Sequence, residues 1–137
     1  MSNSAFVKGL YAAAARGEGG VLIAALHSAV EWKEAEGSPY AAANPYIGAD
    51  AVGALLGRIA TDIVDFRLMP QTFTDGGDVV VVEGRYTGTG ATTKKSLDAP
   101  FAHVWHLRDG KVMRFQQYTD TRQWTQVLGA GSLTPEP

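Results

Sequence analysis

The polar side chains best suited to chemistry lie in one stretch of this chain, residues 97–126. Two alternating apolar runs flank an Asp-Gly pair at 109–110, which predicts two antiparallel strands joined by a tight turn, because both central turn residues must tolerate positive φ. His103 and Trp105 share one face of the first predicted strand, and Asp120 ends the second. We expect these strands to form either a packed core or the wall of a small-molecule pocket.

Asp120 is the first candidate for acid/base catalysis. A carboxylate at an apolar cavity wall is poorly solvated, which raises its pKa and makes it a better proton acceptor near neutral pH. The alternative is structural, because Asp120 followed by Gln123 fits a helix N-cap with its reciprocal partner. Alternation places Asp120 on the face of Gln116 and Tyr118, opposite Gln117, so only one of these sets faces the cavity. Both roles remain open.

His103 is the second acid/base candidate, because histidine titrates near neutral pH; a structural role is the alternative. Trp105 and Trp32 are predicted to belong to the cavity wall or to the core. Glu34 shares the predicted strand face of Trp32. It is either a second carboxylate of the site or a solvated charge at a strand end.

Further ligand contacts are expected from residues with hydrogen-bonding side chains. Tyrosine hydroxyls can donate to a developing enolate oxygen, and the candidates are Tyr40, Tyr46 and Tyr118. Tyr86 and Gln117 complete the predicted ligand-binding residues. One internal pocket for a ligand of one to three rings is expected to be lined by Trp32, Tyr46, His103, Trp105 and Gln117.

The composition predicts one globular domain. The chain has 137 residues, of which 45% are hydrophobic, and a net charge of -2. We expect a domain over residues 1–128 and a flexible tail over 129–137. The charge argues against nucleic-acid or membrane-surface partners. No apolar run approaches the roughly 20 residues that span a bilayer, and no signal-peptide pattern opens the sequence, so a cytoplasmic location is expected.

The order of elements predicts an α+β fold. Helices are expected before residue 17, over 21–26 and from Asp50, with a strand over 28–35 and a loop over 37–48. From Val64 onward the apolar period becomes two, which indicates a run of antiparallel strands. Gly53 and Gly57 in the third helix are predicted to permit close approach of a neighbouring element.

Several of these strands are apolar on both faces, so each face of the sheet needs a cover. The helices can cover one face, and a second subunit is the simplest cover for the other. We therefore expect a homodimer through the outer face, near Glu83, Arg85, Val104 and His106.

Six segments resemble the SnoaL-like polyketide cyclases and ketosteroid-isomerase-related proteins of the nuclear-transport-factor-2-like superfamily. They are residues 30–32 (VEW), 39–48, 82–88 (VEGRYTG), 100–105 (PFAHVW), 108–112 and 115–121 (FQQYTDT). The resemblance implies a cone in which a bent antiparallel sheet wraps around the N-terminal helices and encloses an apolar cavity. Glycines at 84, 88 and 90 suit such bends.

The same resemblance implies a function. SnoaL-like cyclases carry an aspartate proposed as acid/base where this chain has Asp120. The expected activity is a cofactor-free isomerisation or cyclisation by proton transfer on an apolar or polycyclic carbonyl substrate. A non-catalytic ligand-binding or sensing module, or an interaction domain in which the dimer matters more than the cavity, is the alternative. The ketosteroid-isomerase catalytic triad has no match by position.

No metal site or cofactor is expected. His and carboxylate residues are not clustered at metal-ligand spacing, and the chain has no cysteine. The glycines at 17, 19 and 20 follow a predicted helix rather than a strand, so they do not form a phosphate-binding loop.

Overall fold

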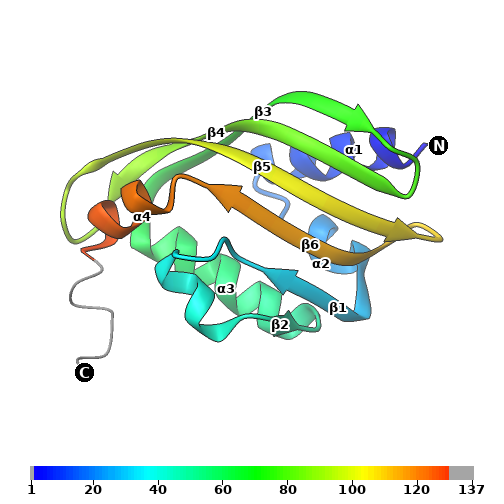
Figure 1. Cartoon of the computed structure of the whole chain (residues 1–137), viewed down its shortest axis with the longest axis horizontal. Helices are drawn as coiled ribbons and strands as arrows, with labels where there is room; N and C mark the ends of the chain where they lie inside the picture. Colours follow the sequence, from blue (N-terminus) through cyan, green and yellow to red (C-terminus); the bar gives the residue numbers. More distant parts are fainter. Residues whose placement is uncertain (1, 130–137) are drawn as a thin grey trace.

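The computed structural model describes residues 2–129. It contains four α-helices, one short 3-10 helix and a six-stranded sheet (Figure 1). In chain order the elements are α1 (Asn3–Ala15), α2 (Gly20–Ala25), β1 (Leu26–Lys33), η1 (Pro39–Ala43), β2 (Tyr46–Ile47), α3 (Ala49–Asp62), β3 (Ile63–Asp75), β4 (Val79–Gly90), β5 (Ser96–Arg108), β6 (Lys111–Thr119) and α4 (Thr121–Leu128).

The sheet is curved and open, with the strand order β2-β1-β6-β5-β4-β3. Strands β3 to β6 form an antiparallel meander, whereas β1 lies parallel to β6. The predicted α+β class and curved sheet are confirmed, with the correction that one strand pair is parallel. Strands β1 and β6 are far apart in the sequence and are not connected by a turn, so no local turn signal could show that they run parallel.

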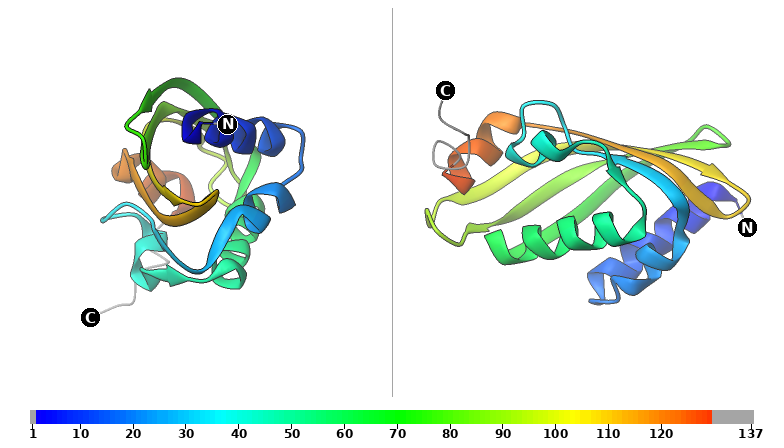
Figure 2. Two further views of the ribbon diagram at one scale, coloured as in Figure 1. Left: turned by 90° about the vertical axis from the view of Figure 1, so that its right-hand side faces the viewer. Right: turned by 90° about the horizontal axis from the view of Figure 1, so that it is seen from below.

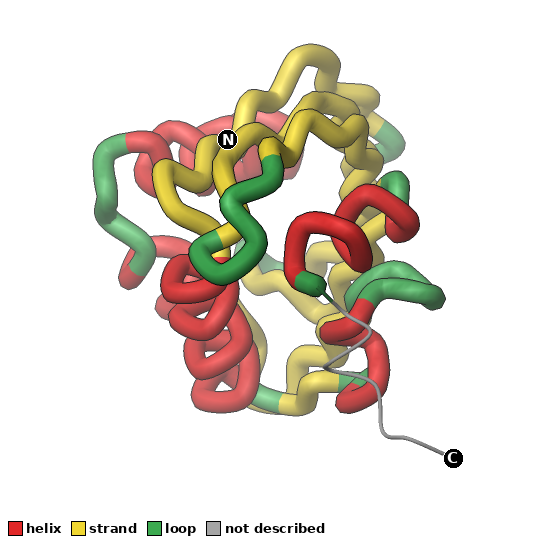
Figure 3. Tube along the Cα trace, turned by 90° about the vertical axis from the view of Figure 1, so that its left-hand side faces the viewer, coloured by secondary structure: helices red, strands yellow, loops and turns green. Residues whose placement is uncertain are grey.

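The sheet curls over the helices (Figure 2). Helix α3 packs against both β1 and β3, which lie near opposite edges of the sheet, and α1 packs against β3 and β4. Figure 3 shows the helices and strands surrounding a common interior. The buried side chains of the inner sheet face and of these helices form one apolar cluster.

Local sequence signals explain the last hairpin. Asp109 and Gly110 both have positive φ, 51° and 73°, as the predicted two-residue turn requires. The first strand begins two residues earlier than predicted, because α2 ends at Ala25 and the chain enters β1 directly. The predicted loop over 37–48 contains η1 and β2.

The expectation for the two glycines of α3 is wrong. A Cβ atom at Gly57 would meet nothing within 4 Å, and one at Gly53 would make only an ordinary contact of 3.7 Å with the Ile23 side chain. Neither glycine therefore permits a close approach.

The predicted C-terminal tail, except Gly129, lies outside the described residues. Within residues 2–129 no helix is long and apolar enough to cross a membrane.

Candidate functional site

A pocket of about 80 Å³ lies inside the curl of the sheet. Its walls come from α1, β1, α3, four further strands and α4, and its aromatic residues lie mostly edge to face or stacked on one another. The lining residues are Tyr11, Trp32, Glu34, Leu56, Ile59, Phe66, Leu68, Tyr86, His103, Trp105, Phe115, Gln117 and Trp124. Leu56, Phe66 and Leu68 are only half-buried, so they form the rim on the side nearest the surface.

Six of the predicted site residues meet in this pocket: Trp32, Glu34, Tyr86, His103, Trp105 and Gln117. Strand alternation brings them together, because five of them lie on the inner face of β1, β4, β5 or β6. The sixth, Glu34, directly follows β1 and continues its alternation.

His103 is held between two tyrosines. Its Nδ1 lies 2.6 Å from the Tyr11 hydroxyl, and its Nε2 is hydrogen-bonded to the Tyr86 hydroxyl. Burial lowers the pKa of His103 to about 3, so the imidazole is neutral near pH 7. Both ring nitrogens are engaged, which leaves neither of them free to exchange a proton with a ligand.

The two tyrosine oxygens also accept hydrogen bonds from fixed donors. Trp105 Nε1 donates to the Tyr11 hydroxyl oxygen at 2.9 Å, and Gln117 Nε2 donates to that of Tyr86 at 2.9 Å. The Gln117 amide is oriented by the backbone N–H of Ala35, which donates to Gln117 Oε1 at 3.0 Å. The polar wall of the pocket is therefore a connected network.

Glu34 is the carboxyl group of the pocket. It is only 3% exposed, and Trp32 Nε1 donates to its Oε2 at 3.1 Å. Burial raises the pKa of Glu34 to about 7, against the smaller opposing effect of the Trp32 hydrogen bond. The interpretation of Glu34 as a solvated strand-end charge is wrong. Near neutral pH its carboxyl can both take and give a proton.

The position of Glu34 is fixed by Asn44. The Glu34 backbone N–H donates to Asn44 Oδ1 at 3.0 Å, and Asn44 Nδ2 donates to the Glu34 carbonyl oxygen at 2.8 Å. These two bonds hold the backbone just after β1, where the Glu34 side chain lies on the same face as Trp32. Sequence reasoning missed Asn44, because its partner lies ten residues earlier across a loop.

Asp120 lies outside this pocket. It is exposed at the N-cap of α4, where its Oδ1 accepts from the Gln123 backbone N–H at 3.3 Å. The Gln123 side chain does not return the bond to Asp120; it pairs instead with the backbone N–H and carbonyl of Asp98. The observed geometry is the capping geometry, without the reciprocal half of the capping box.

The three tyrosines predicted as phenolic donors also lie outside the pocket. The Tyr40 hydroxyl donates to Asp62 Oδ2 at 2.7 Å, and the Tyr46 hydroxyl donates to the Tyr40 carbonyl at 2.6 Å. Tyr118 is 57% exposed on the outer sheet face. The pocket instead uses Tyr11 of α1, which was not among the predicted site residues.

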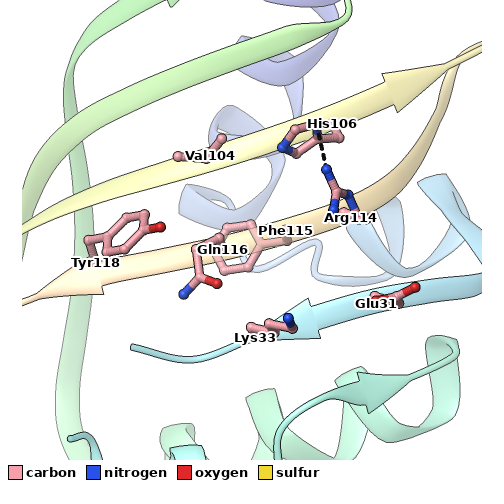
Figure 4. Close-up of a pocket in the computed structure, with 8 residues that line it drawn as sticks. All are labelled: Glu31, Lys33, Val104, His106, Arg114, Phe115, Gln116 and Tyr118. Carbon is pink, nitrogen blue, oxygen red and sulfur yellow. Dashed lines mark hydrogen bonds between the residues drawn. The ribbon is translucent and has the colours of Figure 1, made fainter. Parts of the chain in front are cut away.

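A second hollow, of about 200 Å³, lies on the outer face of β1, β5 and β6 (Figure 4). His106 of β5 and Arg114 of β6 are paired on neighbouring strands, and Arg114 Nη2 lies 3.5 Å from His106 Nδ1. The lining residues are Glu31, Lys33, Val104, His106, Arg114, Phe115, Gln116 and Tyr118.

No group of three histidine, aspartate or glutamate side chains within residues 2–129 is arranged to hold a metal ion.

Solved structures with the same fold are similar over nearly the whole chain. An NTF2-like protein from Burkholderia thailandensis E264 is 32% identical, with a TM-score of 0.84 and coverage of 98% of this chain and 99% of that one. An NTF2-like protein of unknown function from Burkholderia pseudomallei K96243 is 31% identical, with a TM-score of 0.83 and coverage of 93% and 98%. TerC, co-crystallised with polyporic acid, is 26% identical, with a TM-score of 0.79 and coverage of 90% and 95%.

A search of curated proteins gives no match. The family model described as the SnoaL-like domain matches residues 7–115, which include the pocket residues of α1 and of β1 through β5. By this match, the predicted resemblance is confirmed and the chain belongs to the SnoaL-like domain family.

Proposed function

We propose that this protein binds a small carbonyl compound in the inner pocket and catalyses cofactor-free proton transfer at the carbon next to the carbonyl, with Glu34 as acid/base. The observation that carries this proposal is a buried carboxyl whose pKa lies near 7 at the wall of an otherwise aromatic cavity. A general base works best when its pKa is close to the working pH. Glu34 thus takes the role that the sequence suggested for Asp120 or His103.

The size of the pocket limits the ligand. Its volume of about 80 Å³ is smaller than the roughly 150 Å³ cavity that takes one benzene ring. We infer that a small cyclic ligand enters this pocket only in part, with the rest of it lying at the rim formed by Leu56, Phe66 and Leu68. A polycyclic ligand would not fit entirely inside. The co-crystallisation of TerC with polyporic acid supports an organic ligand for this fold.

The second candidate function is a binding or sensing module without turnover. The aromatic lining supports it, because most of the wall offers shape and apolar contact rather than chemistry. The two candidates differ in whether Glu34 exchanges protons with the ligand.

Exchange of the α-hydrogens of cyclopentanone in deuterated buffer, followed by proton NMR, tests the proposed activity. We expect the protein-dependent rate to be low at pH 5, to reach half its maximum near pH 7 and to level off above pH 8, because only ionised Glu34 accepts a proton. Binding without exchange above a protein-free control across this range would favour the binding module.

We further propose that the outer sheet face forms a homodimer. Val79, Val81 and Val104 are half-buried apolar residues on this face, close to the hollow of Figure 4. Light scattering at micromolar concentration is expected to give twice the monomer mass, and Val104→Glu is expected to give the monomer. A monomeric mass for the unmodified protein would contradict this assembly.

A further inference from the structure

The hydrogen bonds around His103 contain one hydrogen more than they can use. The tyrosine–histidine chain, defined as Tyr11, His103 and Tyr86, has two internal links, one at each ring nitrogen. Three hydrogens are available for these two links: one on each hydroxyl and one on the neutral imidazole. Whichever nitrogen carries the imidazole hydrogen, one hydroxyl hydrogen is left over.

The side chains of Trp105 and Gln117, which bond to the two tyrosine hydroxyls from outside the tyrosine–histidine chain, cannot accept the extra hydrogen. The indole of Trp105 can only donate, so Tyr11 must accept that bond. The Gln117 oxygen is already occupied by the Ala35 backbone N–H, so the Gln117 nitrogen must donate to Tyr86. Neither outer group can take the leftover hydrogen. Within residues 2–129, neither hydroxyl has a hydrogen-bond partner beyond its histidine and its outer donor.

Protonation does not remove the surplus. Burial raises the pKa of both tyrosines well above the ordinary value, so both hydroxyls keep their hydrogens near pH 7. Burial keeps His103 neutral, and a protonated ring would increase the surplus to two. Both hydroxyl-bearing side chains line the pocket.

We propose that the leftover hydroxyl hydrogen of the tyrosine–histidine chain belongs to Tyr86 and selects ligands that place a hydrogen-bond acceptor, such as a carbonyl oxygen, against it. His103 then carries its hydrogen on Nε2 and donates to Tyr86, while Nδ1 accepts from Tyr11. The Tyr86 oxygen accepts from both His103 and Gln117, which strengthens its own hydroxyl as a donor.

The choice of Tyr86 rests on its position relative to Glu34. Gln117 donates to the Tyr86 hydroxyl oxygen and accepts from the backbone N–H of Ala35, the residue directly after Glu34, and the side chains of Glu34 and Tyr86 both line the pocket. A ligand oxygen at Tyr86 therefore brings the neighbouring carbon toward the carboxyl. This inference rests on the proposed use of the pocket as the ligand site, but it concerns binding and not turnover.

Two probes of nearly equal shape test the proposal: cyclopentanone, and methylenecyclopentane, in which a carbon replaces the carbonyl oxygen. Dissociation constants are measured at pH 5, where Glu34 is protonated. We expect Tyr86→Phe to weaken cyclopentanone binding by about fivefold to tenfold, the value of one hydrogen bond, and to change methylenecyclopentane binding by less than about twofold. Tyr11→Phe, the matched control, is expected to affect the two probes equally.

Nitrogen-15 NMR of His103 gives a second readout in the unmodified protein. With cyclopentanone bound, His103 is expected to be the Nε2–H tautomer. Methylenecyclopentane has no acceptor oxygen and is not expected to shift the balance between the two tautomers toward Nε2–H.

The proposal is overturned if Tyr86→Phe weakens both probes equally, if Tyr11→Phe selectively weakens the ketone, if neither probe binds, or if bound ketone gives the Nδ1–H tautomer. Loss of the selective effect with intact α-hydrogen exchange would refute the role of Tyr86 alone, whereas a selective effect without exchange would refute the role of Glu34 alone.

Discussion

Replacing Glu34 by glutamine is expected to reduce α-hydrogen exchange of cyclopentanone at pH 7.5 by at least about 100-fold, the usual contribution of a general base. Glutamine has nearly the same shape and can still accept the hydrogen bond from Trp32 Nε1, but it cannot take a proton from carbon. The dissociation constant of the ketone should therefore change little, so that the effect falls on turnover.

Two variants serve as controls for this substitution. Glu36→Gln makes the same chemical change two residues away, at an exposed side chain that is not part of the inner pocket, and should leave exchange unchanged. Asp120→Asn tests the first sequence-based candidate, since asparagine retains the capping bond. If Asp120→Asn stops exchange while Glu34→Gln does not, then Asp120 is the base and the assignment to Glu34 is wrong.

The unusual pKa of Glu34 also leaves a signature that needs no ligand. Its pKa is about 7 in the folded protein against an ordinary value of 4.5. The stability that this group contributes is fully present below pH 4.5 and is lost as the pH rises through 7. Glu34→Gln should remove this part of the pH dependence of the free energy of unfolding.

The local pattern of the strands was sufficient to predict much of the pocket. Trp32, His103, Trp105 and Gln117 were all expected to face it, because alternation fixes which side chains share a sheet face once the hairpin turn is known. Burial on that face then follows from the apolar neighbours.

The chemistry of the pocket could not be read in the same way, because it depends on contacts distant in sequence. Alternation placed Glu34 on the face of Trp32 but left open whether its carboxyl is a group of the site or a solvated charge. The carboxyl is buried in the pocket wall, and two bonds from Asn44 hold the Glu34 backbone. His103 looked titratable, but Tyr11 from the first helix and Tyr86 from β4 occupy both of its nitrogens. The Tyr40 hydroxyl donates to Asp62, and the Tyr46 hydroxyl donates to the Tyr40 carbonyl within the same segment, so neither hydroxyl reaches the pocket.

We expect the curvature of the sheet to depend on a close approach of β3 and β4 at Gly84 in β4. This residue pairs with Pro70 in β3, and the register of the two strands shifts between Pro70 and Thr72. A Cβ atom at position 84 would lie 2.2 Å from the Met69 carbonyl oxygen and 2.7 Å from Phe101 Cζ. Since the first of these contacts is with backbone, the strands would have to separate to relieve it. Strand glycines commonly mark such bends.

Gly84→Ala is therefore expected to lower the free energy of unfolding by about 3 kcal/mol, at the upper end of overpacking effects. Gly57→Ala in α3 is the matched control, because the added methyl group meets nothing within 4 Å and alanine favours a helix interior by up to about 1 kcal/mol. The same chemical change should thus destabilise one site and stabilise the other, as measured by urea denaturation. A stability of Gly84→Ala within about 0.5 kcal/mol of the unmodified protein would show that the sheet bends without requiring a glycine at this position.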